Sequence, residues 1–251
     1  MKTTTGLWPP ISVPVGSVAL GFQRIVSLPD ATPVGAELFT ATSTRSGAAW
    51  HDATVEELHR STTAALQAVR ASGLGSVTVN VDPRLLHAGD VRLDDVTLDD
   101  VTLDDAVGEA ALDATLTIEV LETAPLSRRA VQRVQRWRTV GAKVVLDDYR
   151  GAVDAGRLAE IGTIDGVKLD RTLVIAATGD DAAADEITAL VRRFPIVVAE
   201  GVEDAEVAAA MAALGVRLAQ GWWFHRPCAL IAEVASPSPP RTVRAQVEAC
   251  T

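Results

Sequence analysis

The sequence predicts an α/β barrel in which short apolar strands alternate with helices and close into one ring. At 251 residues the chain has the length of a single barrel domain. Its composition is 48% hydrophobic but only 4% aromatic, which indicates a core of Val, Leu, Ile and Ala typical of alternating strands and helices. Seven apolar runs also end in a polar residue of ligand type. In a closed barrel, the carboxyl ends of parallel strands meet on one face.

The N-terminal part predicts an extended segment, a hairpin and a helix. Residues 1–15 contain three prolines and are expected to be an extended lead-in. Residues 18–28 are strand-like, and a turn over 29–33 leads into a second strand at 34–39, so the first strand is expected to be antiparallel. Thr54 and Glu57 have capping-box spacing, and apolar residues at helical intervals predict a helix to about Ser72, before Gly73.

The rest of the chain predicts alternating strands and helices. Strands are expected at 77–80, 116–122, 143–146, 167–170, 196–200 and 216–220, and helices at 127–137, 180–193 and 204–214. The barrel domain is therefore expected over residues 16–232, followed by a flexible or extended tail at 233–251.

Residues 93–107 form a periodic acidic tract, with three copies of a pentad that carry six aspartates. Three pentads are too few to bury a solenoid core, so we expect a solvated insertion in the barrel domain. A metal-binding repeat is the alternative.

Charge and cysteine content exclude several classes of function. The net charge is −10, which argues against binding to polymeric nucleic acid or to an anionic membrane. Two cysteines are too few for a disulfide framework, and no signal peptide or membrane-length apolar run is evident. We expect a cytoplasmic protein.

The stretch from Gly141 to Arg171 contains the strongest indication of chemistry. An apolar strand leads directly into Asp147 and Asp148, which repel each other unless cations neutralise them. Oxygen ligands favour hard divalent ions such as Mg²⁺ or Mn²⁺. In the next strand, alternation predicts that Lys168 and Asp170 face the same site.

The polar strand ends together predict one shared site on the rim of the barrel. They are Glu37, Asn80, Glu119, Asp147 and Asp148, Lys168 and Asp170, Glu200, and Gln220. Such a group fits two metal ions bridged by an aspartate, which would activate water to attack a phosphodiester. Lys168 could hold that water or stabilise the developing charge. Solvated strand ends are the simpler alternative for any one of these residues, but not for seven strands.

Eight segments along the chain form an ordered set of motifs: FQRI at 22–25, VGAELF at 34–39, VNVDPRLL at 79–86, IEVLE at 118–122, LDDY at 146–149, VKLDR at 167–171, VAEGVED at 198–204 and QGWWFHRP at 220–227. In this order they resemble the motifs of the EAL domain, a bacterial cyclic di-GMP phosphodiesterase family with a modified (β/α)₈ barrel. The resemblance covers about residues 18–227 and implies a modified TIM barrel of EAL type with an antiparallel first strand.

The resemblance also implies roles for individual residues. Glu37, Asn80, Glu119 and Asp147 would ligate one Mg²⁺ or Mn²⁺ ion, and Asp147, Asp148 and Glu200 the second. Asp170 is expected as a further metal ligand. Lys168 would position the water, with Glu200 and Glu203 as further catalytic residues. Gln23, Gln220 and Glu203 would contact cyclic di-GMP, and Glu122 would brace the loop after Asp148. A homodimer is implied as well.

Several departures from the family pattern leave two functions open. The family has an arginine that holds a substrate phosphate where this chain has Ala41, and Arg150 replaces a glycine in the loop after Asp148. The retained acids favour an active phosphodiesterase, in which Arg45 or Arg150 could replace the missing arginine. The departures favour a receptor or interaction module without turnover. Trp222 and Trp223 could stack on a guanine or pack in the core.

Overall fold

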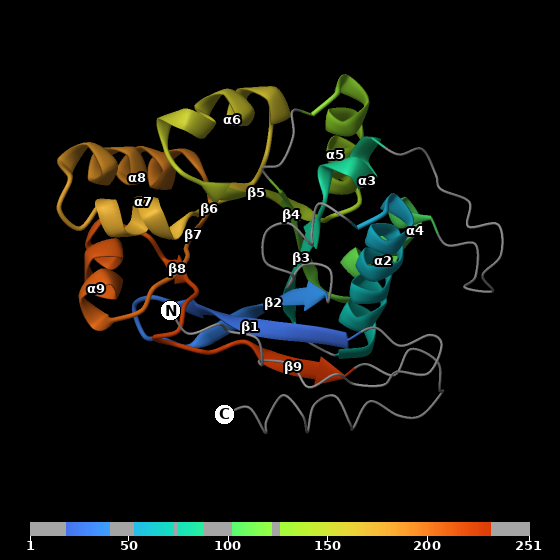
Figure 1. The fold of residues 1–251 in the computed structure, drawn as a ribbon, viewed down its shortest axis with the longest axis horizontal. Helices are drawn as coiled ribbons and strands as arrows, with labels where there is room; N and C mark the ends of the chain where they lie inside the picture. Colours follow the sequence, from blue (N-terminus) through green and yellow to red (C-terminus); the bar gives the residue numbers. More distant parts are fainter. Residues whose placement is uncertain (1–18, 41–52, 73–74, 88–101, 122–125, 232–251) are drawn as a thin grey trace.

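The structure is a closed barrel of eight strands with helices around it. The computed structural model describes residues 19–40, 53–72, 75–87, 102–121 and 126–231 (Figure 1). Strands β2 to β8 run parallel in sequence order, and β1 closes the ring by pairing antiparallel with both β2 and β8. A ninth strand, β9, pairs antiparallel with the start of β1, whereas β8 pairs with the end of β1. The predicted barrel with an antiparallel first strand is therefore confirmed.

The elements have the following bounds. The strands are β1 (Ala19–Ser27), β2 (Pro33–Thr40), β3 (Ser76–Val81), β4 (Thr115–Val120), β5 (Lys143–Tyr149), β6 (Gly166–Leu169), β7 (Ile196–Ala199), β8 (Leu218–Ala219) and β9 (Cys228–Ile231). The helices are α2 (Val55–Ser72), α3 (Pro83–His87), α4 (Leu103–Asp113), α5 (Arg128–Thr139), η1 (Ala152–Asp154), α6 (Ala155–Ile161), α7 (Arg171–Ala176), α8 (Asp181–Arg193) and α9 (Ala205–Ala213). The sequence did not predict α3, α6, α7 or β9, all of which are short.

Local capping explains where the longer helices begin. The capping box predicted for α2 is present: the Glu57 amide donates to Thr54 Oγ1 at 3.1 Å, and the Thr54 amide donates to Glu57 Oε2 at 2.8 Å. Ser127, Asp180 and Asp204 accept backbone N–H bonds in the same way at the starts of α5, α8 and α9. These side chains satisfy amides that have no partner within the helix.

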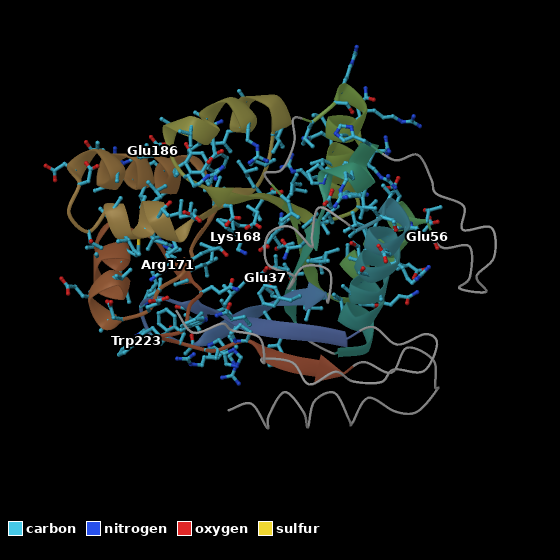
Figure 2. All side chains as sticks on the ribbon, viewed as in Figure 1. Glu37, Glu56, Lys168, Arg171, Glu186 and Trp223 are labelled. Atoms are coloured by element: carbon cyan, nitrogen blue, oxygen red, sulfur yellow. The ribbon has the colours of Figure 1, made fainter. Side chains whose placement is uncertain are left out.

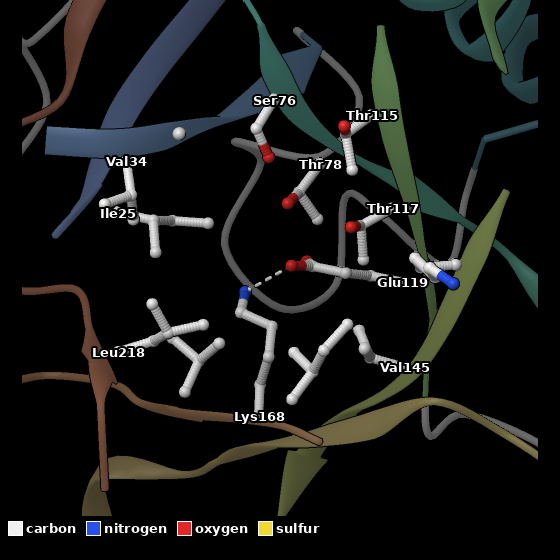
Figure 3. A pocket seen from close by; sticks show the side chains of 14 residues that line it. Ile25, Val34, Ser76, Thr78, Thr115, Thr117, Glu119, Val145, Lys168 and Leu218 are labelled. Atoms are coloured by element: carbon white, nitrogen blue, oxygen red, sulfur yellow. Dashed lines mark ion pairs between the residues drawn. The ribbon is translucent and has the colours of Figure 1, made fainter. Parts of the chain in front are cut away.

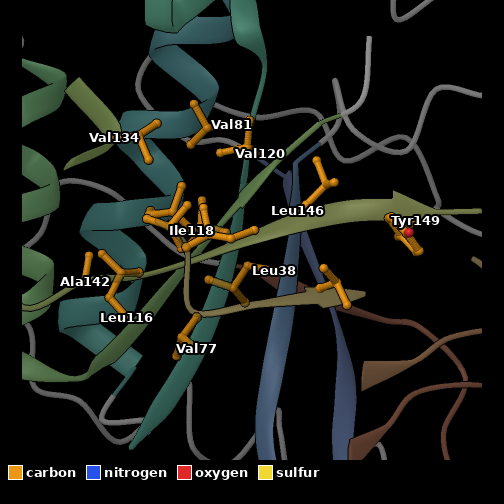
Figure 4. Packing of buried hydrophobic residues seen from close by; sticks show 14 of the residues in the cluster. Leu38, Val77, Val81, Leu116, Ile118, Val120, Val134, Ala142, Leu146 and Tyr149 are labelled. Carbon is orange, nitrogen blue, oxygen red and sulfur yellow. The ribbon is translucent and has the colours of Figure 1, made fainter. Parts of the chain in front are cut away.

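The hydrophobic core lies between the sheet and the helices rather than inside the ring. On β4, Leu116, Ile118 and Val120 belong to this core (Figure 4). Thr115, Thr117 and Glu119 of the same strand instead line the interior of the ring. Side chains alternate between the two faces of a strand, so on β3 and β4 the inner face is left for polar residues. The same alternation places Ser76, Thr78 and Asn80 of β3 inside. Strand patterning thus separates the core from the site.

The end of the acidic tract differs from the predicted solvated insertion, because its third pentad begins helix α4. Thr102 caps this helix, and Leu103 packs into the core at 1% exposure. Asp104 Oδ1 accepts from Arg133 Nε at 2.7 Å and from Trp137 Nε1 at 2.6 Å, both on α5. Burial opposes ionisation, but the pKa of Asp104 lies below its usual value because Arg133 and Trp137 stabilise the carboxylate. The first two pentads, apart from Thr102, lie outside the described residues.

Among the described residues, no helix has the length and apolarity that crossing a bilayer requires. The predicted lead-in at 1–15 and the tail at 233–251 lie outside the described part of the chain.

Candidate active site

Lys168 lies inside the barrel, surrounded by carboxylates from four other strands or strand ends. Figure 2 shows Lys168 and Glu37 within the ring of strands. The ammonium nitrogen is 3.0 Å from Glu37 Oε2, 2.9 Å from Glu119 Oε1, 2.7 Å from Glu200 Oε1 and 3.5 Å from Asp147 Oδ1. Lys168 is 1% exposed and Glu119 is 0% exposed. The structure therefore brings together acids that are up to 163 residues apart in the sequence.

Amide side chains fix the position of Glu37. Asn80 Nδ2 donates to Glu37 Oε1 at 2.7 Å, and Gln220 Nε2 donates to Glu37 Oε2 at 2.7 Å. Gln220 also donates to Gln23 Oε1 at 2.9 Å, and Gln23 Nε2 donates to the backbone carbonyl of His225 at 2.8 Å. Because each amide is held by the next, this chain of bonds orients Glu37 and ties β8 to β1 and β2.

A bulge in β5 brings two adjacent aspartates to the same site. Leu146 pairs with Val167 of β6 and Tyr149 pairs with Leu169, so β5 carries one extra residue between these two pairs. Asp148 within the bulge has φ of +50°, in the left-handed region that few side chains adopt. As a result, carboxylate oxygens of Asp147, Asp148 and Glu200 lie within 4.8 Å of one another.

The electrostatics of the site are those of an acidic cup with one cation. Burial lowers the pKa of Lys168, but Asp147, Glu119, Glu200 and Glu37 together raise it well above its usual value. Burial raises the pKa of Glu119 and of Glu200 well above the usual range, and repulsion from neighbouring carboxylates adds to this shift. Glu37 differs, because Lys168 and the two amides hold its pKa below the usual value despite burial.

The donor set fits divalent cations. The five carboxylates and one ammonium would carry a formal charge of −4 if all were ionised, which two divalent ions would neutralise. In the described structure, the buried oxygens Asn80 Oδ1 and Glu119 Oε2 accept no hydrogen bond. Buried polar atoms without partners are uncommon, and hard cations bind such oxygens. Asp147, Asp148 and Glu200 are placed as a metal group would be.

A small cleft of about 100 Å³ adjoins the cup beside Glu200 and is lined also by Gln23, Glu203, Gln220 and Trp222. Glu203 accepts from Arg171 at 2.9 Å. Trp222 and Trp223 are 51% and 53% exposed, so neither packs in the core, which was one of the two alternatives. The protein's own backbone and side chains require glycine at two positions on this rim. A Cβ on Gly221 would lie 2.1 Å from a backbone oxygen, and one on Gly201 would lie 2.6 Å from Arg171.

Asp170 is placed differently from the prediction. Strand β6 ends at Leu169, so strand alternation does not extend to Asp170. Its carboxylate instead caps α7 by accepting from the Thr172 amide at 2.8 Å and from the Thr172 hydroxyl.

Arg150, a candidate to replace the missing arginine, pairs with Asp154: the Arg150 amide donates to the Asp154 carboxylate at 2.8 Å, and the Arg150 Nε donates to it at 3.4 Å. Ala41, Arg45 and Glu122 lie outside the described residues.

The sequence matches the family described as EAL domain over residues 16–227. Among curated proteins, it is 30% identical over 120 residues to the probable cyclic di-GMP phosphodiesterase PdeN of Escherichia coli K12. That match spans 46% of this chain and 23% of the E. coli protein.

Solved structures with a similar fold include two proteins described as EAL and one further complex with cyclic di-GMP. The EAL enzyme Bd1971, with cAMP and cyclic di-GMP bound, is 20% identical with a TM-score of 0.66, and the match covers 84% of this chain and 62% of that one. BlrP1 of Klebsiella pneumoniae, with calcium and cyclic di-GMP, is 22% identical with a TM-score of 0.64, covering 88% and 58%. An EAL domain protein of Listeria monocytogenes EGD-e is 21% identical with a TM-score of 0.63, covering 84% and 88%.

Proposed function

The chain belongs to the EAL domain family, and on that premise we propose that it hydrolyses one phosphodiester bond of cyclic di-GMP to give linear pGpG. The observation that supports this most strongly is the cup itself. Acids from β2, β4, β5 and the end of β7 converge on Lys168, with the amide of Asn80 beside them. Relatives are described as cyclic di-GMP phosphodiesterases or as complexes with this dinucleotide.

We propose two Mg²⁺ or Mn²⁺ ions in the cup. Glu37, Asn80, Glu119 and Asp147 would hold one, and Asp147, Asp148 and Glu200 the other. When bound, such ions lower the pKa of a water molecule and neutralise charge on the phosphate. Asp170 is left out of this set because its carboxylate caps α7.

The chain's own groups would orient the reactants. Lys168 has a raised pKa, so it would act as a hydrogen-bond donor rather than as a base, holding the attacking water or stabilising the negative charge that develops on the phosphate. Gln23, Gln220 and Glu203 line the cleft next to Glu200 and would contact the dinucleotide there, with Glu200 and Glu203 close to the reaction. A homodimer and a cytoplasmic location stay predictions.

A receptor that binds the dinucleotide without turnover is the second candidate. It is favoured by Ala41 in place of the family's arginine and by the pairing of Arg150 with Asp154, which engages the candidate replacement elsewhere. A misplacement of about 1 Å in a catalytic site can cost roughly 100-fold in rate.

The test is an assay of the purified chain with cyclic di-GMP and Mg²⁺ or Mn²⁺, in which the product is separated by chromatography. We expect linear pGpG from the wild type and at least about 100-fold less from Asp147→Ala. Asp181→Ala, which removes an exposed acid on α8, serves as the control and should match the wild type. Equal rates for Asp147→Ala and the wild type would contradict the proposal.

Calorimetry with Ca²⁺ and cyclic di-GMP separates the two candidates. Heat of binding with Ca²⁺, together with no product in the Mg²⁺ or Mn²⁺ assay, would establish the receptor. Neither heat nor product would leave an interaction module.

A further inference from the structure

A second cavity lies inside the barrel, below the acidic cup. Its volume is about 180 Å³, and it is lined by the inner faces of the strands toward their N-terminal ends in β2 to β8 (Figure 3). Exposed Val34, Thr115 and Lys143 lie at its outer end, and buried Glu119 and Lys168 at its inner end. Barrel interiors are usually filled by layers of bulky branched side chains, so an open volume of this size requires an explanation.

Small residues on one wall account for the space. Gly35 of β2 and Ser76, Thr78, Thr115 and Thr117 of β3 and β4 stand where larger side chains would fill the ring. Register pairs Ser76 with Thr115 and Thr78 with Thr117, so four hydroxyls lie side by side. Figure 3 shows the hydroxyls of Ser76, Thr78 and Thr117 directed into the cavity.

The opposite wall is apolar. It is formed by the side chains of Ile25, Val145, Ile196, Val198 and Leu218. The cavity therefore has one hydroxyl-bearing side and one aliphatic side. A purely apolar molecule would leave the hydroxyls without hydrogen bonds, and a purely ionic one would place its charge against the aliphatic side chains.

Glu119 supplies a polar group at the inner end. Its Oε1 lies 2.9 Å from Lys168 Nζ, but Oε2 accepts no hydrogen bond in the described part of the protein, although the side chain is fully buried. A buried carboxylate oxygen without a donor is costly. In the cation-free protein, a ligand that donates a hydrogen bond here would satisfy it. A divalent ion in the cup would take up Glu119 instead, so the inference concerns the cation-free protein.

We propose that this cavity binds a small neutral molecule with a hydroxyl head and a short aliphatic body, of about six heavy atoms. The head donates to Glu119 and bonds to the threonine hydroxyls, and the body contacts the aliphatic wall. The size follows because a cavity of ~150 Å³ in another protein holds benzene. Neutrality follows because Lys143 at the outer end repels cations, and Lys168 at the inner end is already paired with Glu119 and so offers an anion no free partner.

The test uses butane-1,2-diol as the probe, without divalent cation or dinucleotide, so its outcome does not depend on the proposed function. NMR spectra of the protein with ¹³C-labelled Ile, Leu and Val methyl groups report binding. We expect saturable shifts of the methyl groups of Ile25, Val145, Val198 and Leu218, with a dissociation constant on the order of millimolar.

Matched variants identify the site. Thr117→Val keeps the side-chain shape but removes one hydroxyl, and we expect it to weaken binding by roughly 2- to 10-fold. Thr178→Val makes the same change on an exposed residue beyond α7 and should leave binding unchanged. Val145→Phe should fill the cavity and abolish the saturable shifts, with the methyl signals of Ile187 and Leu190 in α8 reporting that the fold is kept.

Shifts that grow linearly without saturation would overturn the proposal, because the cavity would then hold water only. Equal dissociation constants for Thr117→Val and Thr178→Val would overturn it as well. If Val145→Phe does not fold, this comparison decides the question by itself.

Discussion

Replacing Lys168 by glutamine should strongly destabilise the protein when divalent cations are removed. The ammonium lies within 3.5 Å of four carboxylates, of which Glu37, Glu119 and Asp147 are buried and Glu200 is partly buried, and Lys168 is itself 1% exposed. Glutamine keeps a polar side chain but leaves these carboxylates without their cation. The loss of stability in this variant therefore tests whether Lys168 stabilises the metal-free cup.

The magnitude follows from the burial of the cluster. Removing one partner of a buried ion pair costs about 3–5 kcal/mol. Glu119 and Glu200 already have raised pKa values and can take up protons to relieve part of the repulsion, so we use the lower end, about 3 kcal/mol. For a domain of this size, about 3 kcal/mol corresponds to a fall in melting temperature of roughly 6–12 °C.

The assay is thermal unfolding in EDTA and in excess Mn²⁺. Lys143→Gln removes an exposed lysine from the neighbouring strand β5 and serves as the control. A cation at 100 times its dissociation constant adds about 2.7 kcal/mol, so Mn²⁺ should restore most of the stability of Lys168→Gln. A melting temperature in EDTA within about 2 °C of that of Lys143→Gln would refute the reasoning.

Two further substitutions and one titration test the fold. Asp104→Asn should lower the free energy of unfolding by about 2 kcal/mol in urea at pH 7, and Asp105→Asn, an exposed change in the same turn, by about 0.5 kcal/mol or less. Because the folded pKa of Asp104 is lowered, its contribution is present above the unfolded pKa of about 3.9 and is lost as pH falls through the folded pKa; a pH-independent difference would contradict this. Gly221→Ala should cost about 3 kcal/mol or more, since its Cβ would lie 2.1 Å from a backbone oxygen, whereas Gly156→Ala has open space; equal stabilities would show that the backbone yields. Tyr149 is the chain's single tyrosine, and burial and its bond to Glu186 raise its pKa, so phenolate absorbance should appear only in strongly alkaline or unfolded protein, and titration near pH 10 would be inconsistent with the structure.

The barrel and the members of the cup could be predicted from the sequence because both follow from strand alternation. Apolar runs ending in Glu37, Asn80, Glu119 and Glu200 predict parallel strands whose carboxyl ends share one face. The structure confirms that these four residues lie around Lys168 or its partners. Their roles as metal ligands stay a prediction.

Alternation fails where the strand geometry changes. It places Asp147 and Asp148 on opposite faces of β5 and Asp170 on the same face as Lys168. The bulge in β5 instead brings both aspartates together, and the end of β6 at Leu169 frees Asp170 to cap a helix. Neither event can be read from spacing alone.

Apart from these two places, the strand pattern of the sequence predicts which residues face inward and which face the core, because the two-residue period of a strand is a local property of the chain. How the inner face is filled depends on the folded barrel. Closure of the ring places the ammonium of Lys168 among the carboxylates, and it sets small residues of β2, β3 and β4 together below them. The physical reason is that charge neutralisation and empty volume depend on distances between strands, which no single strand encodes.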